Sequence, residues 1–169
     1  MNEINDLKGQ ELPLKKETYR VWKGIHNRAG KVPYYANVII CCDWYFFSKF
    51  YYWYVPQYER GWQVDKDIIG DGTIYSPDTC IVVPRDVNNM FRVTSNSTSY
   101  PGVYHDKRTN RYYAQIKTFD SKCNAGGSET AEGAHELYMM ARKEKYLSLS
   151  IKYSKHQVLS DLLKKLSEQ

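Results

Sequence analysis

Basic side chains and tyrosines are interspersed over a short stretch of the C-terminal half of the sequence. Residues 100–124 contain five lysines and arginines against two aspartates, and Tyr104, Tyr112 and Tyr113 alternate among them. Lysine and arginine hold phosphates, and an arginine on a strand can also hydrogen-bond guanine in the major groove. We therefore assign DNA contact to Lys107, Arg108, Arg111, Tyr113, Gln115, Lys117 and Lys122. The alternative is that the same residues form a solvated basic face.

The distribution of charge favours DNA contact. The chain of 169 residues has a net charge of +5, and residues 98–169 carry 12 basic and 8 acidic residues, against 12 and 11 in residues 1–97. A polyanion is therefore attracted first to the C-terminal part of the chain. No membrane partner is expected, because the densest apolar stretch, residues 44–55, is too short to span a bilayer.

The cysteines predict neither a zinc site nor a disulfide framework, because none of the four belongs to a CxxC pair. Reduced, buried thiols are typical of a cytoplasmic protein, which is the location that we expect. The N-terminal residues MNEINDLKGQ lack the apolar segment of a signal peptide.

Residues 17–92 are predicted to form one module behind a flexible arm, residues 1–16. The expected elements are a helix over 17–28, a strand over 34–41, a helix over 43–54 with Asp43 as its N-cap, strands over 62–68 and 80–83, and a helix after Pro84. The aromatic residues of 44–54 are expected in the core. The order strand, turn, strand, helix is that of a ββα metal-dependent nuclease core, so the expected fold class is α+β.

A polar linker, residues 93–99, is predicted to separate this module from a second domain, residues 100–150. We expect three short strands there, followed by a helix with Thr130 as its N-cap. Residues 151–169 contain an amphipathic helix with a leucine face. That face is either packed within the chain or a seam for a homo-oligomer.

Two stretches resemble known families. The run WQVDKDIIGDGTIYSPDTCIVVPRDVNNMF, preceded by YRVW and DWYFFSKFYYWY, resembles the HNH homing-endonuclease-like proteins of phages. The run GVYHDKRTNRYYAQI, followed by TAEGAHELYMMARK, resembles an AP2 domain, in which three strands lie on DNA and a helix packs behind them. The resemblances imply an HNH-like module followed by a small AP2-like domain, in a phage protein acting in the host cytoplasm.

The HNH resemblance implies a site at Asp65, Lys66 and Asn88. Asp65 and Asn88, with Asn89 as an alternative to Asn88, stand at the positions of the metal ligands, and their oxygens suit Mg²⁺ or Mn²⁺. Lys66 stands where the family has the histidine that activates water. A lysine has an ordinary pKa of about 10.4 and is therefore cationic at neutral pH, so it departs from the general base of the family.

Three functions follow from these residues. The first is a homing-endonuclease-like protein that cuts or nicks duplex DNA with a divalent metal. The second is a catalytically degenerate DNA-binding protein, in which Lys66 grips a phosphate as a point charge. The third is a module that binds a host protein, because a surplus of aromatic residues is typical of protein–protein interfaces.

Overall fold

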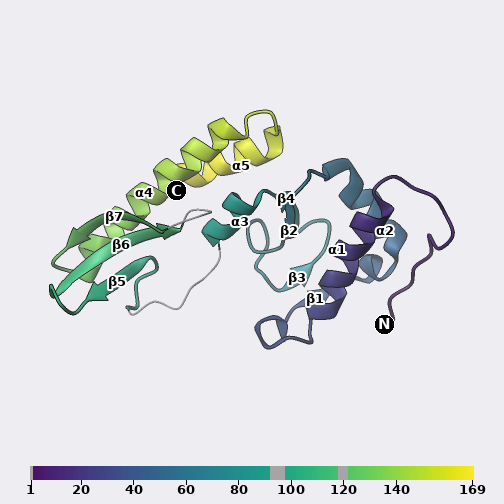
Figure 1. Cartoon of the computed structure of the whole chain (residues 1–169), viewed down its shortest axis with the longest axis horizontal. Helices are drawn as coiled ribbons and strands as arrows, with labels where there is room; N and C mark the ends of the chain where they lie inside the picture. Colours follow the sequence, from purple (N-terminus) through teal and green to yellow (C-terminus); the bar gives the residue numbers. More distant parts are fainter. Residues whose placement is uncertain (1, 92–97, 118–121) are drawn as a thin grey trace. The chain divides into compact units, whose positions relative to one another are not determined.

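The computed structural model describes residues 2–91, 98–117 and 122–169 (Figure 1). The chain forms two compact units, Met1–Asn88 and Asn89–Gln169, and each contains both helices and small sheets. The predicted α+β class is therefore confirmed. The division falls within helix α3 (Arg85–Phe91), before the predicted linker 93–99. Most of that linker, residues 93–97, lies outside the described residues.

The first unit is built around an aromatic core, as the sequence predicts. In chain order it contains α1 (Lys15–Arg28), the 3-10 turn η1 (Pro33–Tyr35), β1 (Ile39–Ile40), the 3-10 turn η2 (Cys42–Tyr45), α2 (Phe47–Tyr54), the 3-10 turn η3 (Val55–Gln57), β2 (Gln63–Asp65), β3 (Ile74–Tyr75), β4 (Ile81–Val83) and α3. On α2, Phe47, Phe50 and Tyr54 are each at most 2% exposed. Their spacing of three and four residues puts them on the side of α2 that packs against Trp22 of α1 and Trp44 of η2.

The N-terminal segment packs against α1 and α2, although its polar sequence predicts a loose arm. The Ile4 amide donates to the Tyr45 carbonyl at 2.8 Å, and the Phe47 amide donates to the Ile4 carbonyl at 2.9 Å. Leu7 is only 5% exposed. Leu7, the backbone hydrogen bonds of Ile4, and the side chains of Glu3 and Asp6, which contact Lys23 and Ser48, hold the segment, and none of these contacts leaves a periodic pattern in the sequence.

Helix α2 begins later than the sequence predicts, and the prediction of Asp43 as its N-cap is wrong. Phe46 is extended (φ −93°, ψ 122°), so the chain turns once in η2 and starts the α-helix only at Phe47. The cap comes from far along the chain, because the Ser48 amide donates to Asp6 Oδ1 at 2.9 Å and the Ser48 hydroxyl donates to Asp6 Oδ2.

The strands of the first unit form two small pairs. β2 lies antiparallel to β4, and α3 follows β4 at once, but the predicted strand 62–68 is reduced to Gln63–Asp65, and β3, which was not predicted, lies between β2 and β4 in the chain. β1 and β3 form a separate parallel pair that the sequence does not predict. The expected strand over 34–41 is reduced to Ile39–Ile40, because Pro33 opens the 3-10 turn η1 instead.

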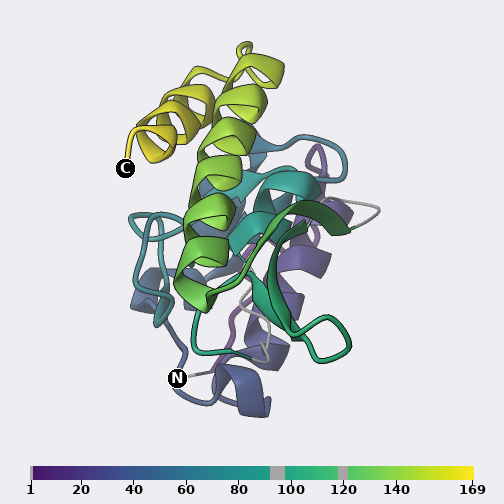
Figure 2. The same cartoon turned by 90° about the vertical axis from the view of Figure 1, so that its left-hand side faces the viewer.

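The second unit is a three-stranded antiparallel sheet with a helix along one face (Figures 1 and 2). Its elements are β5 (Val103–Asp106), β6 (Arg111–Lys117), β7 (Lys122–Ser128), α4 (Ala131–Lys152) and α5 (Gln157–Ser167), with β6 in the centre of the sheet. Thr130 is the N-cap of α4, as predicted, and its hydroxyl accepts from the Gly133 amide at 3.1 Å. Val103 and Ala114 are at most 1% exposed under α4.

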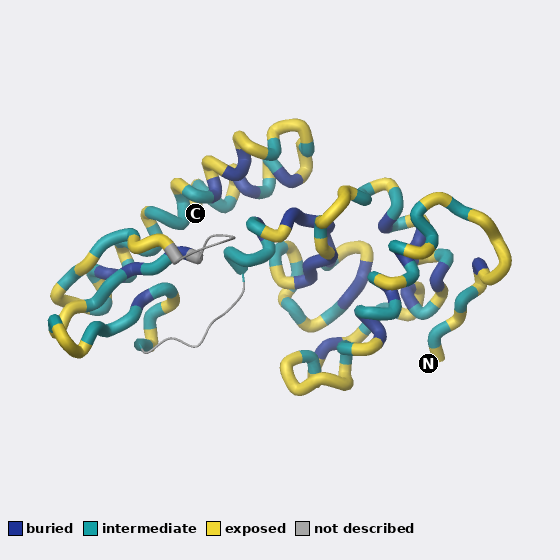
Figure 3. Tube along the Cα trace, in the orientation of Figure 1, coloured by how far each residue is buried: buried dark blue, intermediate teal, exposed yellow. Residues whose placement is uncertain are grey.

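Helix α5 folds back along α4, and its leucines are used inside the unit. Leu159 and Leu163 are 3% and 1% exposed, and the buried stretches of the two helices face one another (Figure 3). This burial supports the packed alternative for the leucine face over a seam for a homo-oligomer. Within the described ranges 2–91, 98–117 and 122–169, no helix is both long enough and apolar enough to cross a bilayer.

Candidate nucleic-acid interface and nuclease-like site

The two faces of strand β6 differ in what covers them. Ala114 and Ile116 are 0% and 7% exposed. Gly126, which pairs with Ala114 across the ladder, lies so close to α4 that a Cβ there would come 2.9 Å from Leu137 Cδ1. Side chains alternate along a strand, so Arg111, Tyr113 and Gln115 lie on the face turned away from α4.

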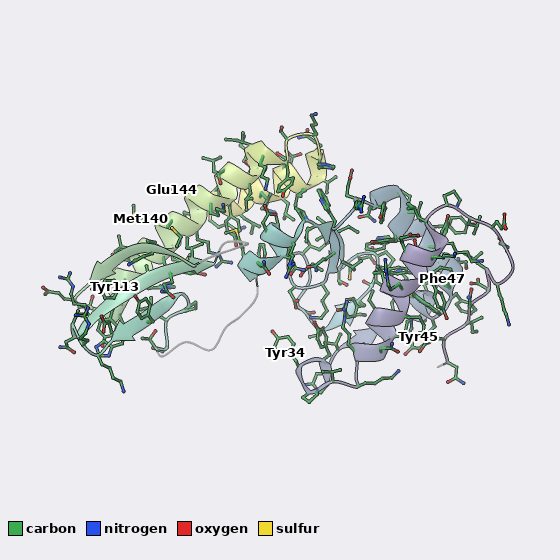
Figure 4. All side chains as sticks on the ribbon, viewed as in Figure 1. Tyr34, Tyr45, Phe47, Tyr113, Met140 and Glu144 are labelled. Carbon is green, nitrogen blue, oxygen red and sulfur yellow. The ribbon has the colours of Figure 1, made fainter. Side chains whose placement is uncertain are left out.

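We call this face the open sheet face and define it by Tyr104, Asp106, Arg111, Tyr113 and Gln115. The ladder pairs Tyr104 with Tyr113, and Asp106 with Arg111, so these residues of β5 and β6 share one face. Figure 4 shows Tyr113 on the sheet, apart from Met140 and Glu144 on α4. The β6–β7 ladder shifts its register beside Ala114. The extra, unpaired residue is Ala125 on β7, so the side chains of β6 still alternate between the two faces of the sheet.

The structure brings three of the seven predicted DNA contacts together on this face: Arg111, Tyr113 and Gln115. Lys107 and Arg108 lie in the turn between β5 and β6, where both are exposed. Asp106 shapes that turn, because its Oδ1 accepts from the Arg108 amide at 2.9 Å and its Oδ2 accepts from the Thr109 hydroxyl at 3.0 Å.

The remaining two predicted contacts, Lys117 and Lys122, form the last described pair of the β6–β7 ladder. Their side chains lie outside the described part of the structure. Tyr104 joins the face although it was not among the predicted contacts. The sequence shows that Tyr104 alternates with the basic residues. The pairing of Tyr104 with Tyr113, however, depends on the register of β5 and β6.

In the first unit, Asp65 is buried and holds the backbone. It is 6% exposed, and its Oδ1 accepts from the amides of Asp67 and Ile68 at 2.8 and 2.9 Å. Burial is the main cause that raises the pKa of Asp65 above its ordinary value, and the two amide hydrogen bonds and Lys66 oppose it. The carboxylate thus closes an Asx turn at the end of β2.

Lys66 is also engaged within the unit. Its side chain is 5% exposed, and its Nζ lies 2.7 Å from Asp67 Oδ1. The same Nζ lies 5.4 Å from the centre of the Tyr35 ring and 5.9 Å from that of Tyr75. The Arg28 guanidinium also lies over both rings, at 5.6 and 5.4 Å, and its Nε donates to the Tyr75 hydroxyl at 2.9 Å. We call Arg28, Tyr35, Lys66, Asp67 and Tyr75 the cation–tyrosine cluster.

Asn88 contacts a neighbour of Asp65 on β2. Its Nδ2 donates to Gln63 Oε1 at 2.9 Å. Gln63 and Asp65 are two residues apart on β2, a separation of about 6.7 Å along a strand. His26 lies in the aromatic core, where it is 3% exposed and its Nε2 is 2.9 Å from the Trp44 carbonyl oxygen; burial is the main cause that lowers the pKa of His26.

Asp65 and Asn88, at the positions that the HNH resemblance implies as metal ligands, both contact other groups of the first unit. Asp65 uses Oδ1 for two backbone amides, and Asn88 contacts Gln63 with its amide nitrogen. Among the described residues, no three histidines, cysteines, aspartates or glutamates lie together so that they could share a metal ion.

Comparison with known proteins gives no further assignment. No family model matches the chain, and no curated protein and no solved structure matches it.

Proposed function

We propose that the protein binds double-stranded DNA through the open sheet face and the adjoining turn, without cutting it. The observation that carries this proposal is the alternation along β6, where Ala114 and Ile116 lie under α4 while Arg111, Tyr113 and Gln115 face away from it. A sheet with one face covered by a helix and the other polar and basic can be laid into the major groove.

The side chains of the face suit this role. An arginine can form a bidentate pair with guanine or hold a phosphate, and a glutamine can form a bidentate pair with adenine. Lys107 and Arg108 protrude from the turn next to Arg111, where they can reach phosphates beside the groove. Three strands with a helix behind them also agree with the AP2 resemblance.

The test is a titration of labelled duplex DNA, followed by fluorescence anisotropy over a series of salt concentrations. We expect binding that weakens with salt, and Arg111→Ala should weaken it further and reduce the salt slope by about 0.9 if Arg111 neutralises one phosphate. Lys165→Ala, at an exposed position of α5, is the matched control. Duplex DNA left unbound in dilute buffer, or equal effects of the two variants, would overturn the proposal and leave binding of a host protein as the alternative.

A nuclease is the second candidate, favoured by the β2–β4–α3 order and by Asn88 beside Gln63. We place it second because Asp65 and Lys66 are buried and hold neighbouring groups of the chain. Incubation of supercoiled DNA with the protein and Mg²⁺ or Mn²⁺ distinguishes the two. We expect uncut DNA, whereas metal-dependent cutting that Asn88→Ala abolishes would establish the nuclease.

A further inference from the structure

Two tyrosine rings form a pair on the open sheet face. Tyr104 and Tyr113 are directly opposite one another on β5 and β6, with ring centres 5.5 Å apart and planes inclined by only 24°. Both side chains are partly exposed, and their strand neighbours Val103 and Ala114 are buried under α4. The rings therefore lie on the side of the sheet that is turned away from α4.

A glycine on the third strand extends this aromatic surface. Gly127 pairs with Tyr113 across the ladder, and a Cβ at Gly127 would come 2.8 Å from Tyr113 Cε1 and 2.9 Å from Tyr113 Cδ1. The ring of Tyr113 therefore lies against the backbone of β7 at Gly127. A side chain at this position would force the ring to move.

The neighbours of Tyr113 on β6 match the other parts of a nucleotide. Arg111 and Gln115 flank it at two residues on either side, about 6.7 Å along the strand. Arginine binds the phosphate, the aromatic ring stacks on the base, and the glutamine amide can hydrogen-bond the base edge. Strand β6 therefore presents, at successive positions of one face, side chains suited to the phosphate, the face of the base and the edge of the base.

The face of a base is accessible only where the base is unpaired or unstacked. In a continuous duplex each base is covered by its neighbours, and a protein in the groove reaches base edges. Stacking on aromatic side chains is typical of proteins that take unpaired nucleotides. A tyrosine pair across two strands also stabilises a sheet by itself, so the two roles need an experiment that separates them.

We propose that Tyr113, supported by Tyr104 and Gly127, stacks on an unpaired base, and that the preferred ligand is duplex DNA containing an unpaired nucleotide. This inference rests on the proposed DNA binding through the open sheet face. It adds the structural class of the DNA and the residue that recognises it.

The experiment compares two labelled duplexes that are identical except for a single bulged adenine in one. We expect the full-length protein to bind the bulged duplex about 5- to 150-fold more tightly, the range of one base stacked on an aromatic side chain. Tyr113→Leu should lose this preference, and Tyr113→Phe should keep it because the phenyl ring still stacks. Tyr34→Leu, at a tyrosine of the first unit that is 73% exposed, is the matched control.

A second variant guards against loss of the fold in Tyr113→Leu. Gly127→Ala keeps both tyrosines but displaces the ring of Tyr113, so it should also lose the preference while its circular dichroism spectrum stays unchanged. The stacking proposal alone would be overturned if the wild-type protein bound the two duplexes equally tightly. It would also be overturned if Tyr113→Leu and Gly127→Ala each weakened binding to both duplexes by the same factor. Absence of binding to either duplex would overturn the proposed function instead.

Discussion

Lys66 shows how the fold keeps a charged side chain almost out of water. Its ammonium group has one carboxylate partner, Asp67, and lies near two tyrosine rings that Arg28 also covers. Two cations in one cluster repel each other, so the Asp67 carboxylate and the electron-rich faces of the rings must compensate for the lost hydration. The cluster explains why a lysine at this position can be structural.

We expect Asp67→Ala to lower the free energy of unfolding by about 1–3 kcal/mol, because it leaves a buried ammonium group without its carboxylate. The figure stays below that of a fully buried pair, since the Asp67 side chain is 49% exposed. Urea unfolding measures the change. Asp67→Ala should cost much less in a Lys66→Met background, and a cost independent of that background would contradict the role given to the pair.

Asp65 allows a prediction that separates its charge from its hydrogen bonds. Asp65→Asn should leave stability at pH 7 unchanged or raised, because an amide oxygen can still accept from the Asp67 and Ile68 amides while the buried charge disappears. Asp65→Ala should cost about 1–3 kcal/mol, because both amides lose their acceptor. Thermal unfolding of the three proteins checks the order.

The pH dependence of the Asp65→Asn variant follows from the raised pKa of Asp65. The folded state holds the proton more tightly than the unfolded state, so the charged form costs stability at neutral pH. Any advantage of asparagine should therefore be present above the raised pKa and disappear as pH falls below the unfolded value of about 3.9. An advantage that grows toward acidic pH would refute the burial of the charge as its cause.

At the scale of the elements, helix α2 depends on a cap from another segment. Asp6 accepts from the amide and the hydroxyl of Ser48, while Phe46, the residue before the helix, offers no polar side chain. Burial raises the pKa of Asp6, but the hydrogen bonds from Ser48 outweigh burial, so the pKa lies below its ordinary value. The ionised carboxylate therefore stabilises the fold.

We expect Asp6→Ala to lower the free energy of unfolding by about 1 kcal/mol at pH 7. A carboxylate with a lowered pKa stabilises the fold above its unfolded pKa of about 3.9, and this stabilisation is lost as pH falls through the folded pKa. The difference between the variant and the wild type should thus shrink in acid. Asp43→Ala is the control, since Asp43 is exposed and does not cap α2; an equal effect of both substitutions would contradict the assignment.

The sequence predicted those elements that local patterns determine. The cap at Thr130 and the leucine face of the C-terminal helix depend on neighbouring residues, and the structure contains both. The cap by Asp6 and the packing of the N-terminal segment join residues about 40 positions apart, so no local pattern contains them.

The candidate sites show the same division. The open sheet face was predicted in part because β6 carries Arg111, Tyr113 and Gln115 in alternation. Tyr104 and Gly127 were missed because their place depends on strand register. The engagement of Asp65 and Lys66 was missed because it depends on burial and on partners in a loop, which the resemblance to HNH proteins does not describe.

At the scale of the whole molecule, the C-terminal unit contains its own core and the whole open sheet face. Val103, Ala114, Leu149 and Leu163 are each at most 2% exposed within it. Phe91 stacks on Tyr146 at 5.7 Å, so a fragment should begin before Phe91 to keep this contact.

We therefore expect residues 89–169, expressed alone, to fold and to bind duplex DNA with a salt dependence similar to that of the full chain. Similarity is expected because most of the excess positive charge lies in residues 98–169. Circular dichroism and anisotropy provide the two measurements. A helical fragment without affinity for DNA would show that the first unit supplies the contacts.

The close approach of Tyr113 to Gly127 also has a consequence for how this protein can change by descent. A lineage that exchanges the glycine for any larger residue must either displace the aromatic ring or replace it with a smaller side chain. The two positions should therefore vary together among descendants of a common ancestor, and glycine should persist at position 127 wherever an aromatic residue persists at position 113.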